Sequence, residues 1–222
     1  TAVDQAAGFE VALQSFADDC NSDSSCPIAP DAIGAIEQLQ ALVEQAPVPA
    51  EPRDLGPGEL STGLALPLYS ESLWPDLADA VAAGLAGDGS DMVDLADQYL
   101  GVADFDVYFA VNCLDWEWPE VPQELLDAGA AAVSESPHFA EPIVNDYVRC
   151  AMWPVEEAPM PAVTAPDAPP ILVVSTTNDP ATPYEAGVRT AERLASGVLL
   201  TYEGDGHTVV GLQLGGKWTR GT

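Results

Sequence analysis

Residues 171–208 have the sequence ILVVSTTNDPATPYEAGVRTAERLASGVLLTYEGDGHT, and this stretch decides the fold. The segment 171–176 is rich in β-branched residues, and its apolar part lacks polar alternation, which is typical of a strand covered on both faces. Residues 184–195 place apolar side chains on one helical face, and residues 198–202 again have the composition of a strand. This order predicts a βαβ unit with two parallel strands.

An acid and a histidine follow the two predicted strands. Asp179 lies in the loop after the first strand, and His207 lies in the loop after the second. Because the chemistry of such sheets gathers beyond the carboxyl ends of the strands, we expect these side chains to lie close together. In a hydrolytic triad a carboxylate orients an imidazole, which takes a proton from a serine, and the order Asp then His is that of the α/β-hydrolases.

The same two residues also have a simpler interpretation. Asp179 can form a turn with its own backbone before Pro180, and His207 can belong to a glycine turn. The spacing alone leaves both interpretations open.

The nucleophile of such a triad has no candidate in this sequence. A search for Gly-x-Ser-x-Gly, the turn that exposes a catalytic serine, finds no match. Ser61 has Glu59 in place of the first glycine, and Ser90 follows Gly89 but is flanked by acids. Neither serine ends a predicted strand.

The residues before 154 are predicted to be mainly helical, because apolar side chains recur at spacings of three and four in six segments. These segments are residues 9–16; Ile33, Ile36, Leu39, Leu42 and Val43 after a cap at Asp31; Leu77, Val81 and Leu85 after Pro75; Met92, Leu95, Ala96, Tyr99 and Leu100; Leu126, Ala130 and Val133; and Ile143, Val144, Tyr147 and Val148.

The chain is expected to have three parts. Six prolines between Pro154 and Pro170 exclude a helix there and favour an extended connector. We therefore divide the chain into a helical region of residues 1–153, a connector of residues 154–170 and a βαβ segment of residues 171–222.

The composition excludes several classes of partner. The 222 residues include 36 acidic and 6 basic side chains, for a net charge of −30. This charge repels nucleic acids and anionic membrane surfaces. No apolar run is long enough for a membrane span. With 47% hydrophobic residues, the chain has enough apolar material for a folded core.

The four cysteines are expected to form disulfides. Cys20 and Cys26 bracket a short polar loop, so closing it costs little entropy, and this leaves Cys113 to pair with Cys150. Their spacing does not match a zinc site. An even number of cysteines in so acidic a chain favours an oxidising compartment.

Other binding sites are not indicated. Neither a metal-binding motif nor a phosphate loop is present, so no cofactor and no metal ligand is inferred. His138, the other histidine, follows Pro137 and is predicted to lie at the surface.

The segments 171–179, 179–183 and 204–208 together resemble the carboxyl-terminal region of secreted actinobacterial tripeptidyl aminopeptidases. The resemblance extends over residues 9–207. Its upstream part is carried by the Cys20–Cys26 loop, Trp74-Pro75, Cys113-Leu114-Asp115-Trp116 and Cys150-Ala151-Met152-Trp153-Pro154.

The resemblance implies an exported serine hydrolase of the α/β-hydrolase fold that releases short peptides from a free amino terminus. Asp179 would then be the orienting acid and His207 the general base, under a helical cap formed by residues 1–153. In that family the serine, the oxyanion loop and the first strands precede the cap, so we expect them upstream of Thr1. The chain would then be an inactive fragment that requires its upstream segment to act on a peptide or small ester. A noncatalytic acidic secreted binding module is the alternative.

Overall fold

The computed structural model describes residues 1–102, 105–158, 160–208 and 217–220. The chain forms two compact units. One unit consists of Val11–Phe105, and the other combines Thr1–Glu10 with Asp106–Thr222. The first helix, α1 (Ala2–Ser22), contributes its first turns to the second of these units and the remainder to the first.

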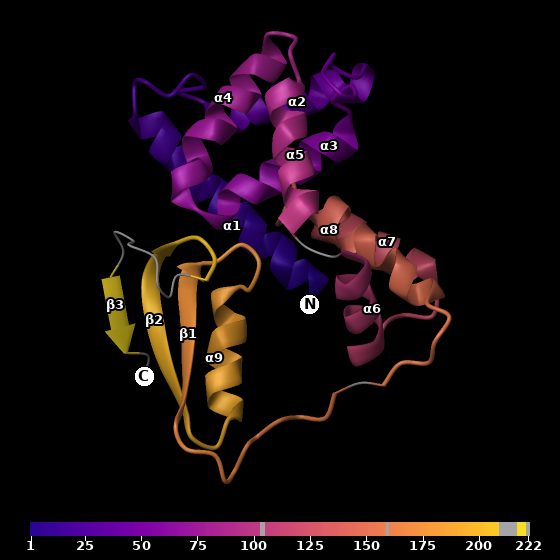
Figure 1. The fold of residues 1–222 in the computed structure, drawn as a ribbon, viewed down its shortest axis with the longest axis vertical. Helices are drawn as coiled ribbons and strands as arrows, with labels where there is room; N and C mark the ends of the chain where they lie inside the picture. Colours follow the sequence, from indigo (N-terminus) through magenta and orange to yellow (C-terminus); the bar gives the residue numbers. More distant parts are fainter. Residues whose placement is uncertain (103–104, 159, 209–216, 221–222) are drawn as a thin grey trace. The chain divides into compact units, whose positions relative to one another are not determined.

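The unit Val11–Phe105 is helical. Its elements after α1 are α2 (Ala32–Gln45), α3 (Pro57–Ala65), the 3₁₀ turns η1 (Leu66–Tyr69) and η2 (Glu71–Leu73), α4 (Trp74–Leu85) and α5 (Ser90–Val102) (Figure 1).

Most of the predicted helical features of this unit are confirmed. Asp31 caps α2, since its Oδ1 accepts a hydrogen bond from the Gly34 amide at 3.1 Å. Leu42 and Leu100, which we assigned to the buried stripes, are exposed instead. The helix α3 was not predicted, because its sequence, PGELSTGLA, lacks a clear apolar stripe.

Close packing in this unit depends on a glycine. A Cβ at Gly63 of α3 would lie 2.6 Å from the backbone oxygen of Met92 in α5. Only a residue without a side chain therefore lets these two helices approach so closely.

The second unit combines helices with a small sheet. After the first turns of α1 it contains α6 (Phe105–Asp115), α7 (Pro122–Ala132), α8 (Ala140–Asp146), the 3₁₀ segment η3 (Tyr147–Met152), β1 (Ile171–Asn178), α9 (Tyr184–Arg193), β2 (Gly197–Asp205) and β3 (Lys217–Arg220).

The buried face of α7 differs from the predicted one. Leu125, Gly129 and Ala132 are buried, whereas Leu126 and Val133 are exposed. A Cβ at Gly129 would lie 2.9 Å from Asn145 Oδ1 and 3.6 Å from Glu141 Cα, so the glycine allows α7 to approach α8. The prediction of Leu126, Ala130 and Val133 as the buried face is wrong because the glycine, rather than the larger apolar side chains, forms the contact with α8.

The predicted βαβ unit is present. β1 and β2 are parallel, with Ile171 opposite Gly197 and Thr176 opposite Tyr202, and α9 connects them (Figure 1). β3 was not predicted, and it pairs antiparallel with β2, so the three strands form a mixed sheet in the order β1-β2-β3. The fully buried ring of Tyr202 lies in β2.

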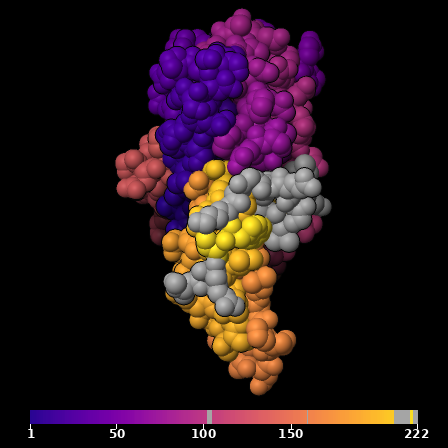
Figure 2. Space-filling view, turned by 90° about the vertical axis from the view of Figure 1, so that its left-hand side faces the viewer, coloured from indigo at the N-terminus to yellow at the C-terminus, as the bar shows by residue number. Residues whose placement is uncertain are grey.

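The first turns of α1 contact the carboxyl-terminal segment. Indigo atoms from the beginning of the chain adjoin orange atoms of this segment in Figure 2. The side-chain amide of Gln5 donates a hydrogen bond to the carbonyl oxygen of Ala181 at 3.0 Å, across 176 positions of sequence.

The proline-rich segment before β1 includes a turn, in which the Ala168 amide donates to the Ala165 carbonyl at 3.2 Å. Residues 154–158 and 160–170 contain neither helix nor strand.

The cysteines are joined in the pairs that the spacing predicts. Cys20 is bonded to Cys26, and Cys113 is bonded to Cys150. Across the described part of the chain, none of the helices is both long and apolar enough to cross a membrane.

Replacement of Gly63 by Ala is expected to destabilise the protein by about 1–3 kcal/mol, because the new methyl group must displace the Met92 backbone. Gly58→Ala in the same helix is the matched control, since a Cβ there would meet no atom within 4 Å. The control should leave stability unchanged or raise it by about 0.5 kcal/mol. Urea unfolding measures both changes, and equal effects of the two substitutions would contradict the packing argument.

Candidate active site

The structure brings Asp179 and His207 together. His207 Nδ1 lies 3.0 Å from each of the two carboxylate oxygens of Asp179. The acid directly follows β1, and the histidine lies two residues after β2, so the parallel pairing of these strands places both loops at the same edge of the sheet.

Asp179 is held by its own loop as well as by the histidine. Its Oδ1 accepts hydrogen bonds from the backbone amides of Ala181 at 3.0 Å and Thr182 at 2.8 Å. Its Oδ2 accepts a hydrogen bond from the Thr182 hydroxyl at 3.0 Å. The two sequence interpretations are therefore compatible, because Asp179 forms the turn with its own backbone and contacts His207 at the same time.

The loop after β2, which carries His207, contains two residues with left-handed backbone conformations. Gly206 has φ +96°, which a residue without Cβ adopts readily, and Thr208 has φ +54°. His207 stands between them. The glycine that suggested a plain turn therefore also aims the imidazole.

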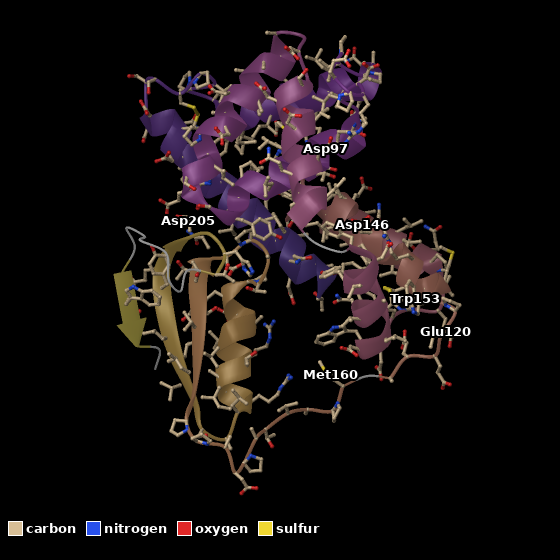
Figure 3. All side chains as sticks on the ribbon, viewed as in Figure 1. Asp97, Glu120, Asp146, Trp153, Met160 and Asp205 are labelled. Carbon is tan, nitrogen blue, oxygen red and sulfur yellow. A yellow bond between two sulfur atoms is a disulfide. The ribbon has the colours of Figure 1, made fainter. Side chains whose placement is uncertain are left out.

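The two strand ends are tied together just before the loops begin. The register shifts after Thr176, and the hydroxyl of Thr177 bridges the gap by donating to the Gly204 carbonyl at 3.2 Å and accepting from its amide at 3.0 Å. Asn178 then donates from its amide nitrogen to Asp205 Oδ1 at 3.0 Å. Asp205, labelled in Figure 3, marks the end of β2 beside this loop.

The burial of the two residues differs in a way that suits acid–base chemistry. The Asp179 side chain is 6% exposed and the His207 side chain 25%. A buried carboxylate with several donors is fixed in place, whereas a partly exposed imidazole can meet another group. With Nδ1 directed at the carboxylate, the ring presents Nε2 on its opposite side.

The structure corrects the prediction for His138. This residue is buried, with Nδ1 2.7 Å from Glu10 Oε1 and its backbone amide donating to Glu10 Oε2 at 3.1 Å. The surface prediction was wrong because it considered only the neighbouring proline, whereas the partner lies 128 positions away.

The remaining candidate groups do not add a site. The Ser61 hydroxyl donates to the Gly58 carbonyl within its own helix, and Ser90 begins α5 rather than following a strand. Within the described ranges, no three His, Cys, Asp or Glu side chains gather in an arrangement that could hold a metal ion.

Sequence reasoning missed the role of Thr182. Its hydroxyl donates to Asp179 Oδ2 and also lies 3.4 Å from His207 Nδ1, so it contacts both members of the pair. The sequence Asp179-Pro180-Ala181-Thr182 could have predicted this contact. A threonine three positions after an aspartate can donate a hydrogen bond to its carboxylate in a turn.

A family model and several known proteins match this chain. Residues 136–214, which include Asp179 and His207, match the family described as TAP-like protein. The chain is 34% identical to the serine protease Hip1 of Mycobacterium tuberculosis over 228 residues. That alignment covers 93% of this chain and 44% of Hip1.

Two further relatives have different names. Carboxylesterase B of Mycobacterium tuberculosis is 34% identical over 226 residues, covering 94% of this chain and 43% of that protein. The tripeptidyl aminopeptidase of Streptomyces lividans is 31% identical over 168 residues, covering 71% of this chain and 31% of that protein. The chain thus spans less than half the length of these relatives. The family match, together with the three relatives, shows that this chain belongs to the TAP-like family of α/β-hydrolases.

Proposed function

We propose that this chain supplies the acid–base part of an exported serine hydrolase that releases short peptides from a free amino terminus. The observation that carries the proposal is the contact between Asp179 and His207 Nδ1 at 3.0 Å, formed by loops that follow neighbouring parallel strands. The hydrolase names of the relatives support the same reaction class.

In this proposal each residue has a distinct role. Asp179 holds the imidazole in the tautomer that carries a proton on Nδ1, and it stabilises the positive charge that the ring gains during the reaction. His207 Nε2 takes the proton from a serine hydroxyl as the serine attacks the carbonyl carbon, and it later delivers that proton to the leaving amine.

The serine comes from a segment of the same protein outside these 222 residues. The sequence contains no Gly-x-Ser-x-Gly, and the chain spans less than half of its relatives. In the described sheet β1 is an edge strand, and Leu172 on it is 60% exposed. An apolar edge of this kind is suited to pair with a further strand, which the missing part of the hydrolase domain would provide.

We propose a role for each of the three parts of the chain in the hydrolase. We assign residues 1–153 to a helical cap over the site, residues 154–170 to a connector and residues 171–222 to the carboxyl-terminal part of the hydrolase domain. The substrate is a peptide or a small ester, and no nucleic acid or cofactor takes part. Export accounts for the two disulfides, which persist in oxidising compartments.

A peptide substrate with a free amino terminus is proposed because one relative is named a tripeptidyl aminopeptidase. Because another relative is named a carboxylesterase, a small ester is the second substrate class to be tested.

In the full-length protein, His207→Ala and Asp179→Asn are each expected to lower kcat/KM by several orders of magnitude, because members of a triad act as a unit. The measurement is hydrolysis of a chromogenic tripeptide anilide by each purified variant, with circular dichroism to show that the variant is folded.

Asp205→Asn is the matched control for these variants. Its carboxylate lies beside the same loop but bonds to Asn178 rather than to the histidine, so hydrolysis should stay within a few-fold of the unchanged protein. Full activity of the His207 variant would refute the catalytic assignment of this residue.

A second experiment addresses the substrate. The full-length enzyme should cleave a tripeptide anilide with a free amine much faster than the same compound with an acetylated amine, because recognition of a free terminus requires the charged group. Equal rates would contradict aminopeptidase action, and activity on a p-nitrophenyl ester alone would identify an esterase.

A further inference from the structure

We propose that the first turns of α1 act as a buttress that positions the catalytic acid. The buttress consists of Gln5 and Gly8, and it supports the acid loop, defined as residues 179–183. This inference rests on the proposed function, since it assigns positioning residues for the same Asp179–His207 pair.

Gly8 lies against the acid loop with no room for a side chain. A Cβ at this position would lie 2.8 Å from the Pro180 carbonyl oxygen, 2.9 Å from Pro183 Cγ and 3.0 Å from the Asp179 carbonyl oxygen. Two of these atoms are backbone, so they could not move without displacing the loop itself. The glycine therefore lets the helix rest directly on the residue that carries the carboxylate.

A hydrogen bond and a charge contact are formed by residues of α1 that precede Gly8. Gln5 donates from Nε2 to the Ala181 carbonyl at 3.0 Å, which fixes the middle of the acid loop. One residue earlier, Asp4 Oδ2 lies 3.7 Å from a guanidinium nitrogen of Arg189 in α9, the helix that follows the loop. The first turns of α1 thus contact both the acid loop and the helix after it.

The helix can support the loop because it is itself fixed at the entrance to α8. Glu10 accepts a hydrogen bond from the backbone amide of His138 and contacts its ring nitrogen at 2.7 Å. The rings of Phe9 and Phe139 lie 5.2 Å apart between centroids, and both side chains are almost completely buried. The contacts with His138 and Phe139 therefore fix the part of α1 that lies next to Gly8.

The position of the loop sets the orientation of the carboxylate. The amides of Ala181 and Thr182 aim Oδ1, and the same loop supplies the hydroxyl that aims Oδ2. A displacement of the backbone would therefore change the angle between the carboxylate and His207, and misplacement of a catalytic group by about 1 Å can lower the rate by about 100-fold.

The competing explanation is that Gly8 is an ordinary helix residue. A glycine inside a helix costs about 1 kcal/mol relative to alanine, so on that explanation Gly8→Ala would stabilise the protein and leave its kinetics unchanged. On our proposal the same substitution forces the acid loop away from the helix.

The test is Gly8→Ala in the full-length enzyme, with Gly58→Ala as the matched control. We expect kcat for the tripeptide anilide to fall about tenfold with little change in KM, because the acid is misplaced while the substrate pocket is intact. The control places its methyl group in open space in α3 and should leave both constants unchanged.

Deuterium uptake of the acid loop gives a readout that does not depend on activity. Pro180 and Pro183 have no amide hydrogen, so Ala181 and Thr182 supply two of the three exchangeable amides in residues 179–183. Both donate to Asp179, and Gly8→Ala should therefore speed their exchange several-fold, as measured by mass spectrometry, whereas Gly58→Ala should not.

Gln5→Glu is a milder variant that tests the same contact if the glycine variant folds poorly. It replaces the donor to the Ala181 carbonyl with an acceptor, and the expected results are faster exchange in the acid loop and a several-fold lower kcat. Gln14→Glu, at an exposed position farther along α1, is its control.

The outcomes separate the two proposals. Unchanged exchange of the acid loop in both Gly8→Ala and Gln5→Glu would overturn the buttress, whatever the activity. Faster exchange with unchanged hydrolysis would also overturn it as a positioning device. The proposed acid–base role of the pair fails if His207→Ala retains full hydrolysis, which is measured separately.

Discussion

The carboxylate of Asp179 is the group on which the rest of the site depends. It is 5% exposed, and a charged group so little solvated is costly unless donors replace the lost water. Two backbone amides and a hydroxyl from its own loop supply most of these donors, and His207 supplies the last contact. The acid loop and the histidine loop are therefore coupled through one buried side chain. Loss of that carboxylate would remove the contacts at 3.0 Å that join His207 to the acid loop.

The parallel sheet makes this coupling possible over 28 positions of sequence. Parallel pairing brings the ends of β1 and β2 to the same edge, and the contacts of Thr177 with Gly204 and of Asn178 with Asp205 hold these ends in register up to the first loop residue. A histidine at the end of an antiparallel neighbour would lie at the opposite edge. The strand direction is therefore a chemical requirement of the pair as well as a feature of the fold.

The first helix contacts two segments that lie far from it in the sequence, the acid loop and the residues just before α8. Gln5 contacts Ala181, and Glu10 contacts His138, so two buried or half-buried polar contacts join the beginning of the chain to its middle and to its end. The pairing of a buried histidine with a glutamate satisfies polar groups that would otherwise destabilise the interior. On the proposal made above for Gly8, these contacts of α1 support the loop that carries Asp179.

Local patterns in the sequence determined the βαβ unit, the cap of α2, the pairing of the cysteines and the expectation that Asp179 and His207 meet. Strand composition, helix capping and the order of the segments depend on residues that are close together in the chain. They can therefore be recognised in a single sequence. The sequence did not determine the buried face of α7, the environment of His138 or the antiparallel strand β3, because each depends on a partner distant in the chain. Gly129 and Gly8 make the reason clear. A glycine looks like a weak point in an isolated helix, and only the tertiary structure shows that another backbone lies where its side chain would be.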